Sequence, residues 1–260
     1  MRWTKTYRVF SNEDLDASWL RDEIVVYLKD ENRYVRTTPT KETGDIPWKT
    51  IRYKTRWFLP AIVAFFVVTS AALPIATHVT SPPNNKVEVN VALVLASLFL
   101  YSAIQVAVHE LSHILALRAF GEKHDRIGAR LEYNFLPTIY VRINRVLLLP
   151  REQRCMVHLA GVAANAIINT MVFTSTFHFA PNGVLFQVST VYSIALAINV
   201  LPFLNTDGYR ALITMLNVGD TKQSTQSLPY RIIKVSSIFF FLCYAVYTVI
   251  IVGSNLELHI

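Results

Sequence analysis

Five consecutive residues, His109, Glu110, Leu111, Ser112 and His113, form the pattern His-Glu-x-x-His. On an α-helix, residues four apart project from the same face about one turn apart, so the two imidazoles can bind one Zn²⁺ ion. Glu110 then lies beside the metal without binding it, where it can take a proton from zinc-bound water and return it to a leaving amine. The spacing therefore predicts a hydrolytic zinc site.

The same motif lies within an apolar stretch, residues 91–119, that is long enough to cross a bilayer. A chance match on a packed helix is the alternative interpretation. Two histidines and a glutamate at membrane depth are costly unless they meet a metal or each other. The apolar surroundings therefore favour the metal site.

The composition indicates a membrane protein. Hydrophobic residues make up 52% of the chain and charged residues 17%, and the mean hydropathy is +0.33. Five apolar segments come near or exceed the roughly 20 residues that a membrane-spanning helix needs: residues 57–77, 91–119, 155–179, 184–204 and 233–252. We therefore predict an all-α polytopic membrane protein with about five transmembrane helices.

The distribution of basic residues predicts an orientation. Lys49, Arg52, Lys54 and Arg56 precede the first apolar segment, and eight further lysines and arginines lie within residues 118–154. By the positive-inside rule, the N-terminus and the 118–154 segment face the cytoplasm, and the C-terminus lies outside. An anionic inner leaflet accounts for the net charge of +7, so no nucleic-acid partner is expected.

Two segments outside the apolar blocks carry patterns of their own. Apolar residues alternate with polar ones over 127–133 and again over 139–143, which predicts a small membrane-associated β-hairpin. In the N-terminal segment, 1–56, Ser11 resembles a helix start, and a loose helical stripe follows, whereas 32–38 is expected to be extended. The residues of the stripe are Leu15, Trp19, Ile24 and Leu28. Since 56 residues are marginal for an independent core, we expect this segment to dock on the membrane or on the rest of the protein.

A catalytic zinc ion usually has three protein ligands and one open position. The soluble extended motif, with a third histidine six residues after the second, is absent because position 119 is Ala. Asp207, at the end of the fourth apolar segment, is the best remaining candidate, since that helix is expected to run in the same direction as the second. A solvated aspartate at the start of a loop is the alternative.

Three motifs in order carry a resemblance to a known family. After His-Glu-x-x-His come Gly161-x-x-x-Asn165 and then Asn199-x-x-Pro202-x-x-x-x-Asp207-Gly. The chain resembles the site-2 protease family of intramembrane zinc metalloproteases over about residues 90–215. It also resembles a bacterial branch of that family that is linked to small ribosomally made peptides.

The resemblance implies a membrane domain, 57–260, in a bacterial cell membrane. Such a domain binds one Zn²⁺ per chain and hydrolyses a membrane-embedded or membrane-associated protein or peptide near the cytoplasmic face. In this comparison Asp207 is the third zinc ligand with His109 and His113, and Glu110 is the catalytic acid and base. Asn165 and Asn199 correspond to asparagines that position the substrate or stabilise the oxyanion. Pro202 is expected to kink its helix, and the hairpin is expected to accept the substrate as an added strand.

Two alternatives remain at this point. A catalytically idle relative could serve in peptide export, immunity or scaffolding, although a purely structural zinc site would not need Glu110. A different membrane metalloprotease family, such as the prenyl-protein proteases, would take its third ligand from a glutamate on a later helix. The later apolar segments contain no glutamate, which disfavours that family.

Overall fold

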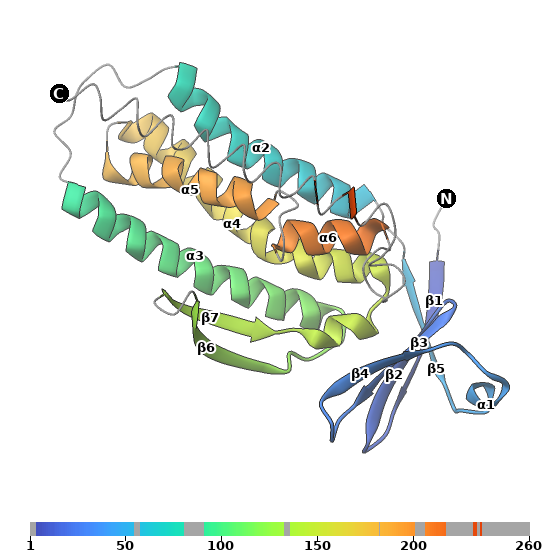
Figure 1. Ribbon diagram of the computed structural model, residues 1–260. Coiled ribbons are helices and arrows are strands. Elements are labelled where there is room, and N and C mark those ends of the chain that lie inside the picture. Colours follow the sequence, from blue (N-terminus) through green and yellow to red (C-terminus); the bar gives the residue numbers. More distant parts are fainter. Residues whose placement is uncertain are drawn as a thin grey trace. The chain divides into compact units, whose positions relative to one another are not determined.

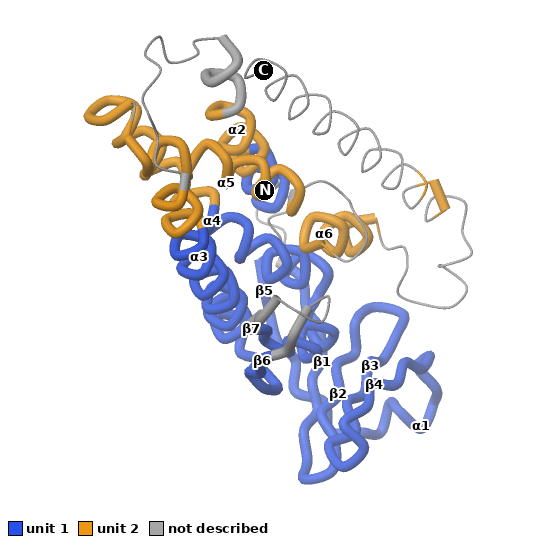
Figure 2. Tube along the Cα trace, turned by 60° about the vertical axis from the view of Figure 1, so that its left-hand side comes forward, with its two compact units in different colours: residues 1–65, 99–165 blue, residues 66–98, 166–260 orange. Residues whose placement is uncertain are grey.

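A computed structural model of the chain describes residues 4–54, 58–80, 91–132, 136–181, 183–200, 206–216, 231, 232 and 235. The chain divides into two compact units (Figure 2), whose boundaries fall within three of the helices. Unit 1 comprises residues 1–65 and 99–165, and unit 2 comprises residues 66–98 and 166–260.

The N-terminal segment of unit 1 is a five-stranded antiparallel sheet, in the order β4-β3-β2-β1-β5 (Figure 1). A short helix, α1, lies between β4 and β5 in the chain. The elements are β1 (Thr4–Ser11), β2 (Leu15–Leu20), β3 (Glu23–Leu28), β4 (Arg33–Thr37), α1 (Lys41–Gly44) and β5 (Lys49–Lys54). The extended segment predicted at 32–38 is confirmed by β4, whereas the helix predicted after Ser11 is wrong.

The register explains this error. Leu15 lies opposite Leu28, and Trp19 lies opposite Ile24, on the paired strands β2 and β3. Directly opposite residues of an antiparallel pair share one face of the sheet. The four residues therefore do form one apolar surface, but the surface belongs to a sheet. The alternation along each strand was obscured because Leu20 and Val25, on the other face, are buried as well.

The opposite face of the sheet shares a core with a later part of unit 1. Tyr7, Leu20 and Val25 are buried together with Leu148, which belongs to the 3-10 helix η1 (Asn144–Leu148). Charged side chains surround this contact: Lys5 pairs with Glu152 at 2.9 Å. The sheet is therefore docked on the η1 segment.

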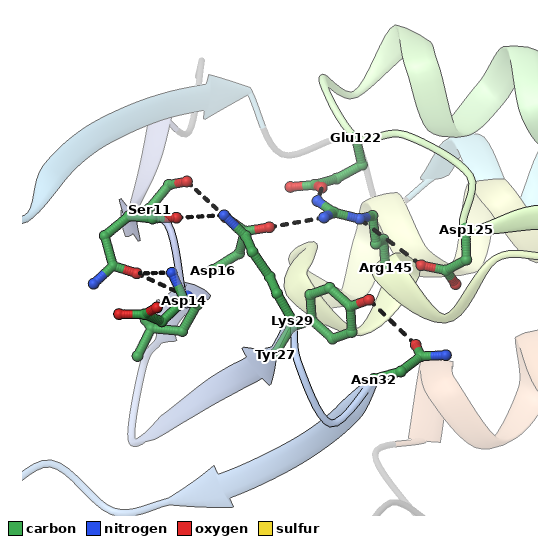
Figure 3. A network of polar contacts seen from close by, with 11 residues as sticks. Ser11, Asp14, Asp16, Tyr27, Lys29, Asn32, Glu122, Asp125 and Arg145 are labelled. Carbon is green, nitrogen blue, oxygen red and sulfur yellow. Dashed lines mark hydrogen bonds and ion pairs between the residues drawn. The ribbon is translucent and has the colours of Figure 1, made fainter.

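Arg145 of η1 contacts three carboxylates (Figure 3). Its guanidinium lies 2.8 Å from Asp16 of β2, 3.4 Å from Glu122 and 3.8 Å from Asp125. Lys29 also pairs with Asp16, at 3.2 Å. One arginine thus connects the N-terminal sheet to the segment that links α3 and β6.

The rest of the chain is mostly helical, with one β-hairpin in unit 1 beside the C-terminal part of α3 (Figure 1). The elements are α2 (Phe58–Thr80), α3 (Val91–Ala119), β6 (Arg126–Glu132), β7 (Leu136–Arg142), α4 (Arg151–Phe179), α5 (Val184–Val200) and α6 (Asp207–Leu216). The predicted hairpin is confirmed, since β6 and β7 pair antiparallel with Ile127 opposite Val141.

The prediction of an all-α polytopic membrane protein with about five transmembrane helices is wrong. The chain contains a five-stranded sheet, and in the described ranges two helical segments are long and apolar enough to cross a membrane, Ala92–Ala119 and Arg151–Phe179. Within the described residues, the apolar parts of α2 and α5, Leu59–Pro74 and Val184–Asn199, are shorter. The fifth predicted segment, 233–252, lies outside the described residues.

Unit 2 contains its own polar and aromatic contacts. Asn169 of α4 donates a hydrogen bond to the Ser193 hydroxyl of α5 at 2.8 Å, and both side chains are fully buried. The Phe173 ring stacks on Phe177 and Phe186. These contacts hold the second half of α4 against α5.

Candidate metal centre

The two motif histidines lie in the last three turns of α3, with their rings toward each other. The Nε2 atoms of His109 and His113 are 3.1 Å apart, as the spacing of four residues on a helix predicts. Two ligand atoms of a tetrahedral zinc ion, each bound at roughly 2.0–2.1 Å, lie about 3.3 Å apart. The paired nitrogens are therefore at the separation that a shared ion requires.

His113 is buried, and its second nitrogen has a main-chain partner. Its Nδ1 lies 2.7 Å from the Val157 carbonyl oxygen of α4. A carbonyl only accepts hydrogen bonds, so Nδ1 carries the proton and Nε2 keeps its lone pair. An outer contact of this kind fixes both the tautomer and the ring orientation of a metal ligand.

His109 has a side-chain partner instead. Nδ1 of His109 lies 3.2 Å from Nδ2 of the Asn165 amide. Rotating that amide by half a turn places Oδ1 at the same point without changing its shape, and this oxygen then accepts a hydrogen bond from the Nδ1–H of His109. In that state Nε2 of His109 has the lone pair that a metal needs.

Gly161 leaves the space beside both ligand nitrogens open. A Cβ atom built at this position would lie 2.7 Å from Nε2 of His109 and 2.7 Å from Nε2 of His113. Real side chains almost never approach so closely, and only glycine fits here without displacing the imidazoles. The residues present therefore fit a metal ion held by the two Nε2 atoms.

Glu110 accepts a hydrogen bond from the hairpin. The main-chain N–H of Val141 in β7 donates to Oε2 of Glu110 at 2.9 Å. The Glu110 side chain is half-buried and leaves α3 next to His109. A carboxylate at this place can exchange a proton with a water molecule beside the histidines.

Asp207 and Asn199 belong to unit 2. Asp207 is the first residue of α6, directly after Thr206, whose hydroxyl accepts a hydrogen bond from the Tyr209 N–H at 3.3 Å. Asn199 lies near the C-terminal end of α5. Both are half-buried, and their part in the site stays a prediction. Pro202, between them, lies outside the described residues.

Sequence reasoning did not foresee two of these contacts. It assigned Asn165 to the substrate, whereas the described contact joins this amide to His109. The spacing of Gly161 and Asn165, one helical turn apart, was the available signal, because it places both residues on one face of α4. No local pattern marked the Val141 N–H.

No family model matches the chain, and no solved structure matches it. It is 33% identical over 122 residues to a curated protein of Bacillus subtilis (strain 168) described as "Putative peptide zinc metalloprotease protein YydH". The matched residues are 46% of this chain and 48% of that protein, so the chain spans about half the length of the curated relative it matches. This likeness links the chain to zinc metalloproteases and to protease function in general.

Proposed function

We propose that the chain is an intramembrane zinc endopeptidase of the site-2 protease type, which cleaves a membrane-embedded or membrane-associated protein or peptide near the cytoplasmic face. The observation that carries the proposal is the pair of Nε2 atoms 3.1 Å apart, with Gly161 leaving the adjacent space open. The likeness to a curated peptide zinc metalloprotease supports it.

The proposed ligands of one zinc ion are His109, His113 and Asp207. Two neutral imidazoles and one carboxylate form a set that catalytic zinc sites use, with the fourth position open. The half-buried Asp207 at the start of α6 supplies the acidic residue type that the two histidines lack. When bound, zinc lowers the pKa of a water molecule to about 7 and polarises a carbonyl group.

Glu110 is the proposed general base and acid. Its carboxylate removes a proton from the attacking water as the new C–O bond forms at the substrate carbonyl carbon. Glu110 then returns that proton to the amide nitrogen as the C–N bond breaks, which yields a carboxylic acid and an amine. Because the Val141 N–H donates to Oε2, Oε1 is the oxygen to which we assign the proton transfer.

The proposed substrate binds in an extended form. Peptide bonds within a helix have their N–H and C=O groups paired, so a helical substrate must unwind before the water can attack it. An exposed strand edge offers new partners to those groups. The proposed place is the edge of β7, and the hydrogen bond from the Val141 N–H to Glu110 supports this choice.

The membrane location is supported by α3 itself. Only 11% of the most apolar 18-residue stretch of this helix is buried, whereas the core helix of a soluble protein would be mostly covered by other parts of the protein. Leu95, Phe99 and Leu100 are 60%, 70% and 63% exposed. Such a row of exposed apolar side chains is expected to lie against lipid.

The zinc content of the purified full chain tests the ligand set. We expect one zinc ion per chain for the wild type and for Glu110→Gln, because Glu110 does not bind the metal. We expect loss of zinc for His109→Ala and for Asp207→Ala. Glu13→Gln, which changes an exposed carboxylate of the N-terminal sheet, is the control and should leave the zinc content unaltered. Metal-free wild-type protein that cannot take up added zinc would contradict the proposal.

Comparison of the cleaved peptides in cells that produce the wild type or Glu110→Gln tests the activity. We expect new peptide termini with the wild type that are absent with the variant. A synthetic peptide that spans such a terminus then serves as the reporter substrate. Equal cleavage of this reporter by Glu110→Gln would exclude the proposed role of the glutamate.

A further inference from the structure

The hydrogen bond between Val141 and Glu110 places a main-chain group of β7 on the predicted catalytic carboxylate. Both residues belong to unit 1, and the donor–acceptor distance is 2.9 Å. Because the donor is a main-chain N–H, its position depends on the hairpin and not on a rotatable side chain. The bond can therefore hold one carboxylate oxygen in place while the other remains available.

The direction of the Val141 N–H shows which residues of β7 point their main-chain groups away from β6. In an antiparallel pair, successive residues point their N–H and C=O groups alternately toward the partner strand and away from it. Val141 points its N–H at Glu110 and lies opposite Ile127 of β6. Residues 137 and 139 share its parity, so their main-chain groups also point away from β6. Pro137 agrees with this assignment, since a proline has no N–H to give to a partner strand.

The outer edge of β7 therefore has few donors. Pro137 has none, and the Val141 N–H is committed to Glu110. Between them, Ile139 is the residue of β7 whose N–H and C=O both point to the outer edge by the same alternation.

The end of β7 is tied to the end of α3 by several bonds. The Asp125 N–H donates to the Arg142 carbonyl at 2.9 Å, and the Asn144 N–H donates to the Asp125 carboxylate at 2.9 Å. Glu122, whose N–H donates to the Leu117 carbonyl of α3 at 3.1 Å, also pairs with Arg145 (Figure 3). These bonds hold Val141 in place relative to the helix that carries Glu110.

We propose that the outer edge of β7 serves two separate tasks. The N–H of Val141 positions the carboxylate of Glu110, and the main chain of Ile139 pairs with the backbone of the substrate. This inference rests on the proposed peptidase function and adds a register to it. The substrate is an extended peptide whose residue opposite Ile139 has a free N–H, which excludes proline at that position.

Two proline variants separate the two tasks. Val141→Pro removes the donor to Glu110, and Ile139→Pro removes the donor to the substrate. Both variants place a proline at an outward-pointing position of β7, the kind of position that Pro137 already occupies. They are matched controls for each other. The probe is the reporter peptide that the wild type cleaves and Glu110→Gln does not.

For Val141→Pro we expect kcat to fall about tenfold with little change in KM, because a positioned base is lost and binding is not. For Ile139→Pro we expect KM to rise about tenfold with little change in kcat. Both variants should keep the zinc content of the wild type. Equal effects of the two variants on kcat and on KM, or an unchanged kcat in Val141→Pro, would overturn the proposal.

Hydrogen exchange of the Val141 amide tests the contact without any substrate. We expect exchange roughly tenfold faster in Glu110→Ala than in the wild type, because the acceptor is gone. Glu110→Gln keeps an acceptor oxygen and should remain near the wild-type rate. Equal exchange in all three proteins would overturn the positioning contact. A wild type that cleaves no peptide would instead contradict the proposed function, while the exchange result would still stand.

Discussion

His109 and His113 lie on the same face of α3, but the groups that hydrogen-bond to their Nδ1 atoms differ in kind. His113 is held by the main-chain carbonyl of Val157, whereas His109 is held by the side chain of Asn165. A main-chain partner is present whatever side chain occupies position 157, while the amide at position 165 depends on one residue. The His109 ligand is therefore the one that a single outer substitution can misorient.

Gly161→Ala tests the space between the two imidazoles. A Cβ there would meet both Nε2 atoms at 2.7 Å, so one ring or the helix must move. We expect zinc affinity to fall by about 10–100-fold, measured by competition with a chelator of known affinity. Gly44→Ala is the control, because a Cβ at Gly44 has no atom within 4 Å. Unaltered zinc affinity in Gly161→Ala would show that the metal does not lie between these nitrogens.

At the scale of elements, the contact between the N-terminal sheet and the η1 segment combines an apolar core with partly buried charge. Burial raises the pKa of Glu122, and the Arg145 guanidinium beside it offsets this only in part. Burial also raises the pKa of Asp125. For these two carboxylates, the free energy lost when water is removed from the charged form therefore exceeds the free energy gained from their ion pairs with Arg145.

The raised pKa of Glu122 predicts a pH dependence of stability. The folded state holds the proton at pH values where the unfolded state has released it, so the free energy of unfolding falls as the pH rises above the ordinary value of 4.5. Each unit by which the pKa is raised corresponds to about 1.4 kcal/mol, and the fall ends at the raised pKa.

Glu122→Gln cannot titrate and should show a flatter profile over the same range. The measurement is denaturant unfolding followed by Trp19 and Trp48 fluorescence, with the other two tryptophans replaced by phenylalanine. The same slope in the variant would assign the pH dependence to other groups.

At the scale of the whole molecule, α3 combines a polar motif with an apolar exposed surface. Its histidines have polar partners within unit 1, whereas its N-terminal half exposes large apolar side chains such as Leu95 and Leu100. In water this surface would be unfavourable, and in lipid it is the stable arrangement. The helix is therefore suited to a membrane even though a sheet forms part of the chain.

Leu95→Asp and Leu100→Asp test this arrangement. An aspartate near the middle of a membrane-spanning helix costs about 3 kcal/mol, whereas on a water-exposed surface it has little effect. We expect both variants to be retained less in membranes after washing with alkaline carbonate, while the wild type and Leu95→Ala stay in the membrane fraction. Release of the wild type by the wash would contradict the proposed location.

The amino-acid sequence by itself determined the features that depend on neighbours along the chain. The spacing of His109 and His113 placed two nitrogens on one helix face, and the alternation over 127–133 and 139–143 gave the β6–β7 hairpin. The helix predicted in the N-terminal segment was wrong, because apolar residues on both faces of β2 and β3 also match a loose helical spacing. The separation of Leu15, Trp19, Ile24 and Leu28 along the chain did not reveal that they meet across two strands.

Only the tertiary structure decided which groups surround the motif. Val141 reaches Glu110 from 31 residues away, Val157 reaches His113 from 44, and Asn165 reaches His109 from 56. Each of these hydrogen bonds needs both the distance and the direction of its two groups to be correct. Directions between distant segments are set by how the hairpin and α4 pack on α3, and no local periodicity encodes that packing.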